Sequence, residues 1–151
     1  MISLRFEVEA PEIDPKALKA DARAVLKAIG KPRSELSLLV VDDPAMRVLN
    51  RDFRGIDRTT DVLSFSQVED EEGPPVPGVP EALGDVVISA PTAKRNAGRY
   101  KRTLPQELRR LLVHGVLHLL GHDHKKPAEA KVMRAEERRV MALLRGADPQ
   151  R

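Results

Sequence analysis

The chain contains no cysteine. Disulfide bonds and thiolate metal sites are therefore excluded, and any bound metal ion needs His, Asp or Glu ligands. Aromatic residues are scarce, with three Phe, one Tyr and no Trp, which argues against the base-stacking platforms of common RNA-binding modules. The longest apolar run, from Leu111 to Gly121, is interrupted by two histidines and is too short to span a bilayer.

The composition is that of a soluble globular protein. Of the 151 residues, 41% are hydrophobic and 32% are charged, and a chain of this length buries enough surface for one core. We therefore expect a single domain over residues 1–151. Charges at Arg5, Glu7 and Glu9 interrupt any apolar core of a signal peptide, so we expect a cytoplasmic protein. The net charge of +3 favours a polyanion such as RNA without identifying one.

Hydrophobic periodicity predicts an α+β fold with a mixed four-stranded sheet and helices packed on it. Residues 2–9 alternate apolar and polar side chains, as a half-buried strand does, and Asp14-Pro15 has the pattern of a helix start. We interpret the acidic, proline-rich residues 69–81 as a mobile surface loop. The predicted strands are 2–9, 36–41, 62–65 and 83–89, and four of the predicted helices cover about 15–29, 91–99, 105–120 and 127–144.

Two of the predicted helices carry apolar stripes that bear on the core. A fifth helix begins at Asp42-Asp43-Pro44 and carries Met46, Leu49 and Phe53. In the last helix we assign the stripe to core packing. Its members are Val132, Ala135, Val140, Leu143 and Leu144.

All the histidines of the chain lie between His114 and His124. His114 and His118 are four residues apart in a predicted helix, which places both rings on one face, one turn apart. Gly121 permits a positive φ, so the backbone can leave the helix and bring His124 to the open side of the pair. Three imidazole nitrogens leave a fourth position for water, as in catalytic zinc sites. We therefore predict His114, His118 and His124 as ligands of one Zn²⁺ ion.

Other features of this segment have roles that the sequence leaves open. His122 can act as a proton shuttle or simply be exposed, and Asp123 can orient a ligand imidazole or cap the turn. The metal can be catalytic or structural, and three histidines also accept nickel, cobalt or copper.

The histidine spacing is similar to that of the metzincin proteases, H-E-x-x-H-x-x-G-x-x-H. In those proteases the Glu after the first histidine is the general base. This chain has Gly115 at that position, and glycine cannot accept a proton. A zinc hydrolase acting on peptides is therefore kept only as an alternative, since it would need a carboxylate from elsewhere.

Three segments resemble the YbeY endoribonucleases, the bacterial rRNA maturation factors. Residues 114–124 read H-G-V-L-H-L-L-G-H-D-H and resemble the family signature. Residues 49–54, L-N-R-D-F-R, followed by 60–65, T-D-V-L-S-F, resemble a second block, and 83–88, L-G-D-V-V-I, a third. The matches follow the family's order and cover most of the chain. One departure is Ser66, where the family commonly has proline.

The resemblance implies an α+β fold whose helical layer holds the metal site, with His114, His118 and His124 as zinc ligands. It implies a catalytic or substrate-positioning role for Arg54. The implied activity is metal-dependent cleavage of single-stranded RNA in ribosomal RNA maturation, especially at the 3′ end of the small-subunit RNA, and in ribosome quality control. The implied partners are ribosomal RNA and the ribosome. A non-enzymatic ribosome-associated factor with a structural metal is the second alternative.

A guanidinium at position 54 suits phosphodiester chemistry, because its planar fork of donors can hold phosphoryl oxygens as negative charge develops on them. From the residue alone, a structural ion pair of Arg54 with Asp57, Asp61 or Asp85 is favoured, and the family block favours the substrate role. The general base stays open among zinc-bound hydroxide, His122 and, on a route through the RNA 2′-hydroxyl, a local proton acceptor. Basic residues before the metal helix form either a solvated face or a phosphate-contacting track; they include Lys94, Arg95, Arg99, Lys101 and Arg102.

Overall fold

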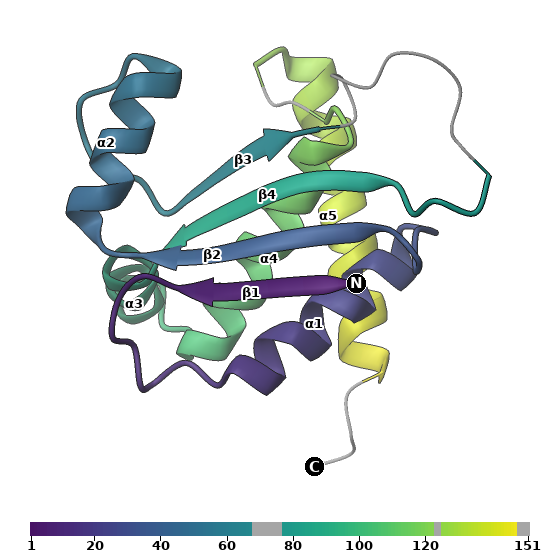
Figure 1. Cartoon of the computed structure of the whole chain (residues 1–151), viewed down its shortest axis with the longest axis horizontal. Coiled ribbons are helices and arrows are strands. Elements are labelled where there is room, and N and C mark those ends of the chain that lie inside the picture. Colours follow the sequence, from purple (N-terminus) through teal and green to yellow (C-terminus); the bar gives the residue numbers. More distant parts are fainter. Residues whose placement is uncertain (68–76, 123–124, 148–151) are drawn as a thin grey trace.

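The computed structural model describes residues 1–67, 77–122 and 125–147. Four strands form one mixed sheet in the order β1-β2-β4-β3 (Figure 1). The strands β1 (Ile2–Phe6), β2 (Glu35–Val41) and β4 (Ala82–Ser89) are parallel, and β3 (Val62–Ser66) pairs antiparallel with β4 at one edge. The four predicted strands are confirmed, although β1 ends at Phe6 rather than at residue 9. Of the predicted loop over 69–81, residues 69–76 lie outside the described residues.

The five predicted helices are confirmed, and local capping explains where several of them begin. Asp14 accepts a hydrogen bond from the Lys16 backbone N–H at the start of α1, and Asp42 does the same for Ala45 at the start of α2. Such caps satisfy N–H groups that have no partner inside the helix. The helices are α1 (Pro15–Ala28), α2 (Asp43–Arg54), α3 (Ala90–Arg99), α4 (Leu104–Leu119) and α5 (Pro127–Ala147).

Alternation along the strands divides the core between the two faces of the sheet. On β2, Leu36, Leu38 and Val40 point into the main cluster beneath α1 and α4. On the opposite face Val41 joins a smaller cluster with Met46 of α2. In Figure 1, α1, α4 and α5 lie behind the sheet and α2 stands at the left. The α+β prediction, with helices packed on a mixed sheet, is therefore confirmed.

Helix α5 packs on α1 and α4 rather than directly on the sheet. Our assignment of its apolar stripe was wrong for Val132, Ala135 and Leu143, which are exposed, Val132 by 59% and Leu143 by 50%. The buried positions of α5 are Ala130, Met133, Val140 and Leu144, in agreement with helical spacing of i, i+3, i+10 and i+14. The difference arises because helical periodicity predicts that apolar residues recur on one side of the helix but does not define the edges of that side. Residues next to the buried positions can therefore be either buried or exposed.

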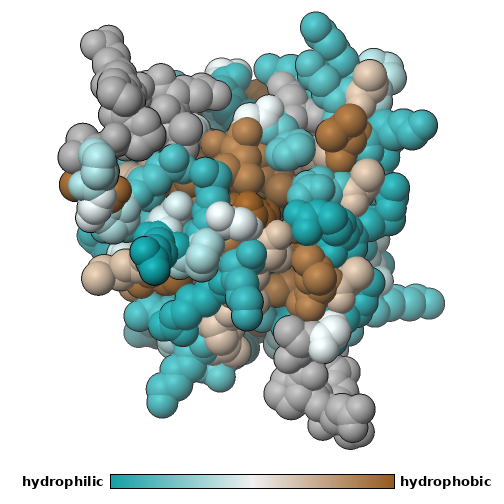
Figure 2. Space-filling model, turned by 90° about the vertical axis from the view of Figure 1, so that its right-hand side faces the viewer, coloured by the Kyte–Doolittle hydropathy of each residue, from teal (hydrophilic) through white to brown (hydrophobic). Residues whose placement is uncertain are grey.

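One face of the molecule shows how polar and apolar residues are distributed. The face at the right of Figure 1 is covered mostly by hydrophilic residues, with apolar residues gathered near its centre (Figure 2). None of the helices in the described part of the chain has the length and apolar content to cross a membrane.

Candidate functional site

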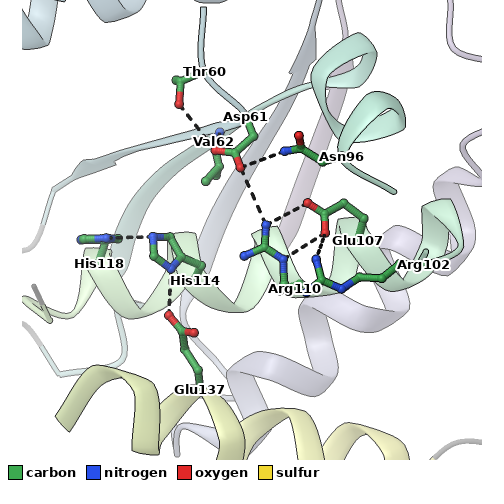
Figure 3. A network of polar contacts seen from close by, with 10 residues as sticks. All are labelled: Thr60, Asp61, Val62, Asn96, Arg102, Glu107, Arg110, His114, His118 and Glu137. Atoms are coloured by element: carbon green, nitrogen blue, oxygen red, sulfur yellow. Dashed lines mark hydrogen bonds and ion pairs between the residues drawn. The ribbon is translucent and has the colours of Figure 1, made fainter. Parts of the chain in front are cut away.

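Helix α4 carries two of the predicted metal ligands. Thr103 and Gln106 form a reciprocal capping box at its first turn, which fixes where the helix begins. From there the helix brings His114 and His118 to the same face, with ring centroids 4.6 Å apart (Figure 3). Their Nε2 atoms are 3.1 Å apart. The predicted pairing of these two rings is therefore present in the structure.

The separation of the two Nε2 atoms suits a shared metal ion. With zinc–nitrogen distances of about 2.0–2.1 Å and tetrahedral angles, two ligand nitrogens lie about 3.3 Å apart. The two nitrogens of His114 and His118, 3.1 Å apart, approach that spacing. These two side chains fit zinc as a donor pair.

Glu137 of α5 orients the first histidine. Its Oε1 lies 2.8 Å from His114 Nδ1, and each of the two side chains is only 26% exposed. The hydrogen bond from His114 lowers the pKa of Glu137, against the opposing effect of burial, so the group is a carboxylate at neutral pH. Because a carboxylate can only accept a hydrogen bond, Nδ1 of His114 carries the proton and Nε2 of the same ring has a free lone pair for a metal ion. A carboxylate at the second ring nitrogen is a common neighbour of metal-ligating histidines.

Helix α4 ends in a reversal at Gly121, whose φ is +92°. The Gly121 N–H donates to the His118 carbonyl and the His122 N–H to the Leu117 carbonyl. These two bonds are the Schellman pattern, which places glycine at the left-handed position. The predicted turn is confirmed up to His122. His124 and Asp123 lie outside the described residues, and within the described part no three His, Asp or Glu side chains form a metal-ligating group. The role of His124 stays a prediction.

The packing around Gly115 explains why the residue after the first histidine is not a glutamate. A Cβ at this position would lie 2.8 Å from Val86 Cγ1 and 3.2 Å from Ser64 Oγ, so the position faces the sheet and has no room for a side chain. The Ser64 hydroxyl donates to the Gly115 carbonyl at 2.8 Å, which ties β3 to α4 beside the histidines. A carboxylate at residue 115 would thus be buried against the sheet.

The histidine pair opens onto a cavity of about 960 Å³ between α2, β3 and the end of α4. Arg54, the last residue of α2, lies on its wall, and so does His122. Arg54 and the histidines that the sequence singled out are 60 or more positions apart in the chain, and the fold brings them to one cavity. The lining residues are Phe53, Arg54, Thr60, Asp61, Val62, Leu63, Ser64, Ser66, His114, His118, Gly121, His122 and Lys125.

Within the described residues Arg54 forms none of the ion pairs that we considered for it. Asp57 pairs with Arg47 at 2.8 Å, and the Asp61 carboxylate lies 3.8 Å from Arg110. The guanidinium of Arg54 is exposed at the cavity and is held there by its place at the end of α2. The structural ion pair is therefore not formed with any of the three aspartates, and the side chain can contact a substrate.

A polar network lies behind Asp61, which lines the cavity (Figure 3). Arg110, one turn before His114 on α4, contacts both Asp61 and the fully buried Glu107. Burial alone would raise the pKa of Glu107, but hydrogen bonds and charge from Arg110 and Arg102 lower it, and Glu107 raises the pKa of Arg110 in return. Asp61 also accepts from the Asn96 side chain at 3.3 Å. This network anchors the loop before β3 to α4.

The basic stretch before the metal helix is largely paired. Arg95 contacts Asp43, Arg102 contacts Glu107, and Lys94 lies 3.8 Å from Glu12. None of these residues lines the cavity. The structure thus favours the solvated, structurally paired face over a phosphate track leading to the site.

Known proteins that are similar to this chain indicate one family. Residues 3–145 match the family model described as Endoribonuclease YbeY. The chain belongs to the YbeY endoribonuclease family. A protein named Endoribonuclease YbeY in Myxococcus xanthus is 52% identical over 120 residues, which are 80% of this chain and 40% of that protein. One of the same name in Pelotomaculum thermopropionicum is 46% identical over 145 residues, which are 94% and 93% of the two chains.

The solved structures support the fold of this YbeY-family chain. The solution structure of a protein from Thermotoga maritima aligns with a TM-score of 0.57 at 23% identity, over 100% of this chain and 99% of that one. The predicted family membership and the predicted α+β fold with a mixed four-stranded sheet are therefore confirmed.

Two residues of the site escaped the sequence analysis. Glu137 was not singled out, although it lies between Met133 and Val140 in the buried stripe of α5, where an acidic residue is a signal for a buried partner. Phe53 was assigned only to an apolar helix stripe, yet it is 67% exposed and lines the cavity. Its place directly before Arg54 was the available signal.

Proposed function

We propose that this YbeY-family chain is a zinc-dependent endoribonuclease that cleaves single-stranded RNA. The observation that carries the proposal is the convergence of His114 Nε2 and His118 Nε2, 3.1 Å apart, on a cavity whose wall bears Arg54. Its proposed role is ribosomal RNA maturation, at the 3′ end of the small-subunit RNA, and ribosome quality control. With ribosomal RNA as substrate, we place the protein in the cytoplasm with the ribosome as its partner.

His114, His118 and His124 would hold the zinc ion. Bound there, zinc would supply Lewis acidity toward a phosphoryl oxygen and lower the pKa of a bound water. The chain's own residues prepare this centre, since the carboxylate of Glu137 fixes the Nδ1–H tautomer of His114 and thereby directs its Nε2 toward His118.

Arg54 supplies the contact to the phosphate. Its planar guanidinium can donate two parallel hydrogen bonds to non-bridging oxygens, which orients the phosphodiester and stabilises the charge that develops on it. Asp61 faces the same cavity, and its contacts with Arg110 and Asn96 offset a charge that would otherwise repel phosphate. His122 also lines the cavity, where its imidazole would be placed to serve as a proton shuttle.

A peptide hydrolase is less well supported. Gly115 packs against Val86 and Ser64 of the sheet, so the position that bears the general base in metzincins cannot carry one here.

The test measures metal content and RNA cleavage on the same preparations. We expect His114→Ala to lose zinc and cleavage together, and Arg54→Glu to keep zinc and lose cleavage by roughly 100-fold or more, as for removal of one transition-state donor. Arg51→Glu is the matched control, because Arg51 lies one turn earlier on α2, contacts Asp52 and does not line the cavity. Normal cleavage by Arg54→Glu would show that the role given to Arg54 is wrong. RNA cleavage that survives removal of zinc from the wild-type protein would contradict the metal-dependent function itself.

A further inference from the structure

Phe53 is placed unusually for a phenylalanine of an amphipathic helix. Met46, on the same helix, is fully buried against the sheet, whereas Phe53 in the last turn of α2 leaves 67% of its surface exposed. A single exposed apolar side chain needs no explanation by itself. Here, however, the ring lies on the wall of the candidate site and not on an arbitrary surface.

The ring of Phe53 is held in place from one side. It meets the ring of Phe65 on β3 at a centroid distance of 5.0 Å and an interplanar angle of 71°, an edge-to-face contact. Whichever ring presents its edge, Phe65 can cover at most one face of Phe53. At least one face is therefore left for a planar ligand, and the Phe65 contact reduces the entropy that stacking would cost.

The chemistry beside Phe53 is that of a nucleotide site. Arg54 follows directly in the chain and lines the same cavity of about 960 Å³, as do His114 and His118. A phosphate held by Arg54 therefore brings the base of an adjoining nucleotide near Phe53. Exposed aromatic rings next to cationic side chains bind single-stranded nucleic acids by stacking, and they do so with little preference among bases.

We propose that Phe53 is a stacking subsite for one unpaired nucleobase of the RNA whose phosphate contacts Arg54. This inference rests on the proposed function and adds to it a physical reason for single-strand specificity, because a base in a duplex has both of its faces covered by neighbouring bases. The phenyl ring offers a π-face and no hydrogen-bonding group, so stacking on it has little preference among the four bases. It revises the expectation that a chain with so few aromatic residues binds RNA without stacking.

The absence of tryptophan from the chain provides a spectroscopic test. Phe53→Trp introduces a sole tryptophan that keeps an aromatic face at the site, and Tyr100→Trp introduces one at a control position. Tyr100 is 54% exposed, contacts Arg99 and Arg102, and does not line the cavity. Titration of the zinc-loaded variants with a single-stranded RNA oligonucleotide should quench the fluorescence of Phe53→Trp and leave that of Tyr100→Trp unchanged. Equal quenching of both variants, or of neither, would overturn the proposal.

Kinetics give an independent measurement. In single-turnover cleavage, Phe53→Leu should raise the protein concentration for half-maximal rate by roughly 5- to 150-fold, the range for loss of one stacked base, with a smaller effect on the maximal rate. Tyr100→Leu should change neither. A third measurement uses a set of RNAs in which a single abasic nucleotide stands at each position in turn. For the wild-type protein, one of these RNAs should bind more weakly than the unmodified RNA. For Phe53→Leu the same RNA should bind as the unmodified RNA does, because the stacking contact is already lost.

The outcomes separate this inference from the function on which it rests. If the wild-type protein cleaves single-stranded RNA and Phe53→Leu has the same half-maximal concentration, the stacking subsite is wrong and the function stands. If Phe53→Leu and every abasic substitution add independently, Phe53 contacts a part of the RNA other than a base, and the stacking subsite is wrong. If the wild-type protein neither binds nor cleaves RNA, both proposals fail.

Discussion

The hydrogen bond between Glu137 and His114 allows us to predict how much zinc affinity is lost when this one contact is weakened. We consider Glu137→Gln, which keeps the size of the side chain and removes the charge that holds the Nδ1–H of His114. A hydrogen bond to a charged group contributes about 1.5–3 kcal/mol. Removal of an outer contact of a ligating histidine typically costs 10–100-fold in metal affinity, which corresponds to about 1.4–2.7 kcal/mol. The two estimates agree, and the 2.8 Å distance and partial burial of the pair favour the full effect.

The assay is a competition between the protein and a chromogenic zinc chelator at fixed pH. Glu137→Gln should bind zinc about 10- to 100-fold more weakly than the wild-type protein. Glu136→Gln is the matched control, because the neighbouring carboxylate pairs with Arg139 and does not contact His114. Wild-type affinity in a folded Glu137→Gln would refute the orienting role. Equal losses in both variants would show a general effect of charge on α5 instead.

Two further predictions concern the frame around the site. Gly115→Ala should lower the free energy of unfolding by about 1–3 kcal/mol, because its Cβ would lie 2.8 Å from the buried Val86. Gly146→Ala is the control and should be neutral or stabilising, because a Cβ at that position meets nothing within 4 Å. Equal melting temperatures for Gly115→Ala and the wild-type protein would contradict the packing argument. The third prediction concerns Asp43, whose side chain links α2 to α3. Burial raises the pKa of Asp43, but hydrogen bonds from Ser89, Thr92, Arg95 and Thr59 outweigh it and lower the pKa from the ordinary 3.8 to about 2. Its stabilisation is therefore complete above the ordinary pKa and lost as pH falls through about 2. The stability difference between wild type and Asp43→Asn should shrink over that range in urea denaturation, and a constant difference would show that ionisation of Asp43 contributes nothing.

The sequence determined the elements of this fold because the rules that set them act between neighbouring residues. Alternation in residues 2–6 specifies a strand by itself, and Asp14-Pro15 specifies a helix start by supplying a cap and a suitable φ. The spacing of His114 and His118 specifies a common face in the same way, since one helical turn separates them whatever else the chain does. Gly121 likewise predicted the end of α4.

Only the tertiary structure decided which residues meet across elements. The order β1-β2-β4-β3 places β3 at an edge beside α4, and no local pattern encodes that pairing. The rotation of α5 on α1 and α4 decided that Glu137 faces His114 while Val132 faces solvent. The end of α2 placed Phe53 and Arg54 on the wall of a cavity whose histidines come 60 residues later in the chain. Such contacts depend on packing summed over the whole core, because a helix can rotate by a few tens of degrees with little change in its own hydrogen bonds and yet exchange its buried neighbours.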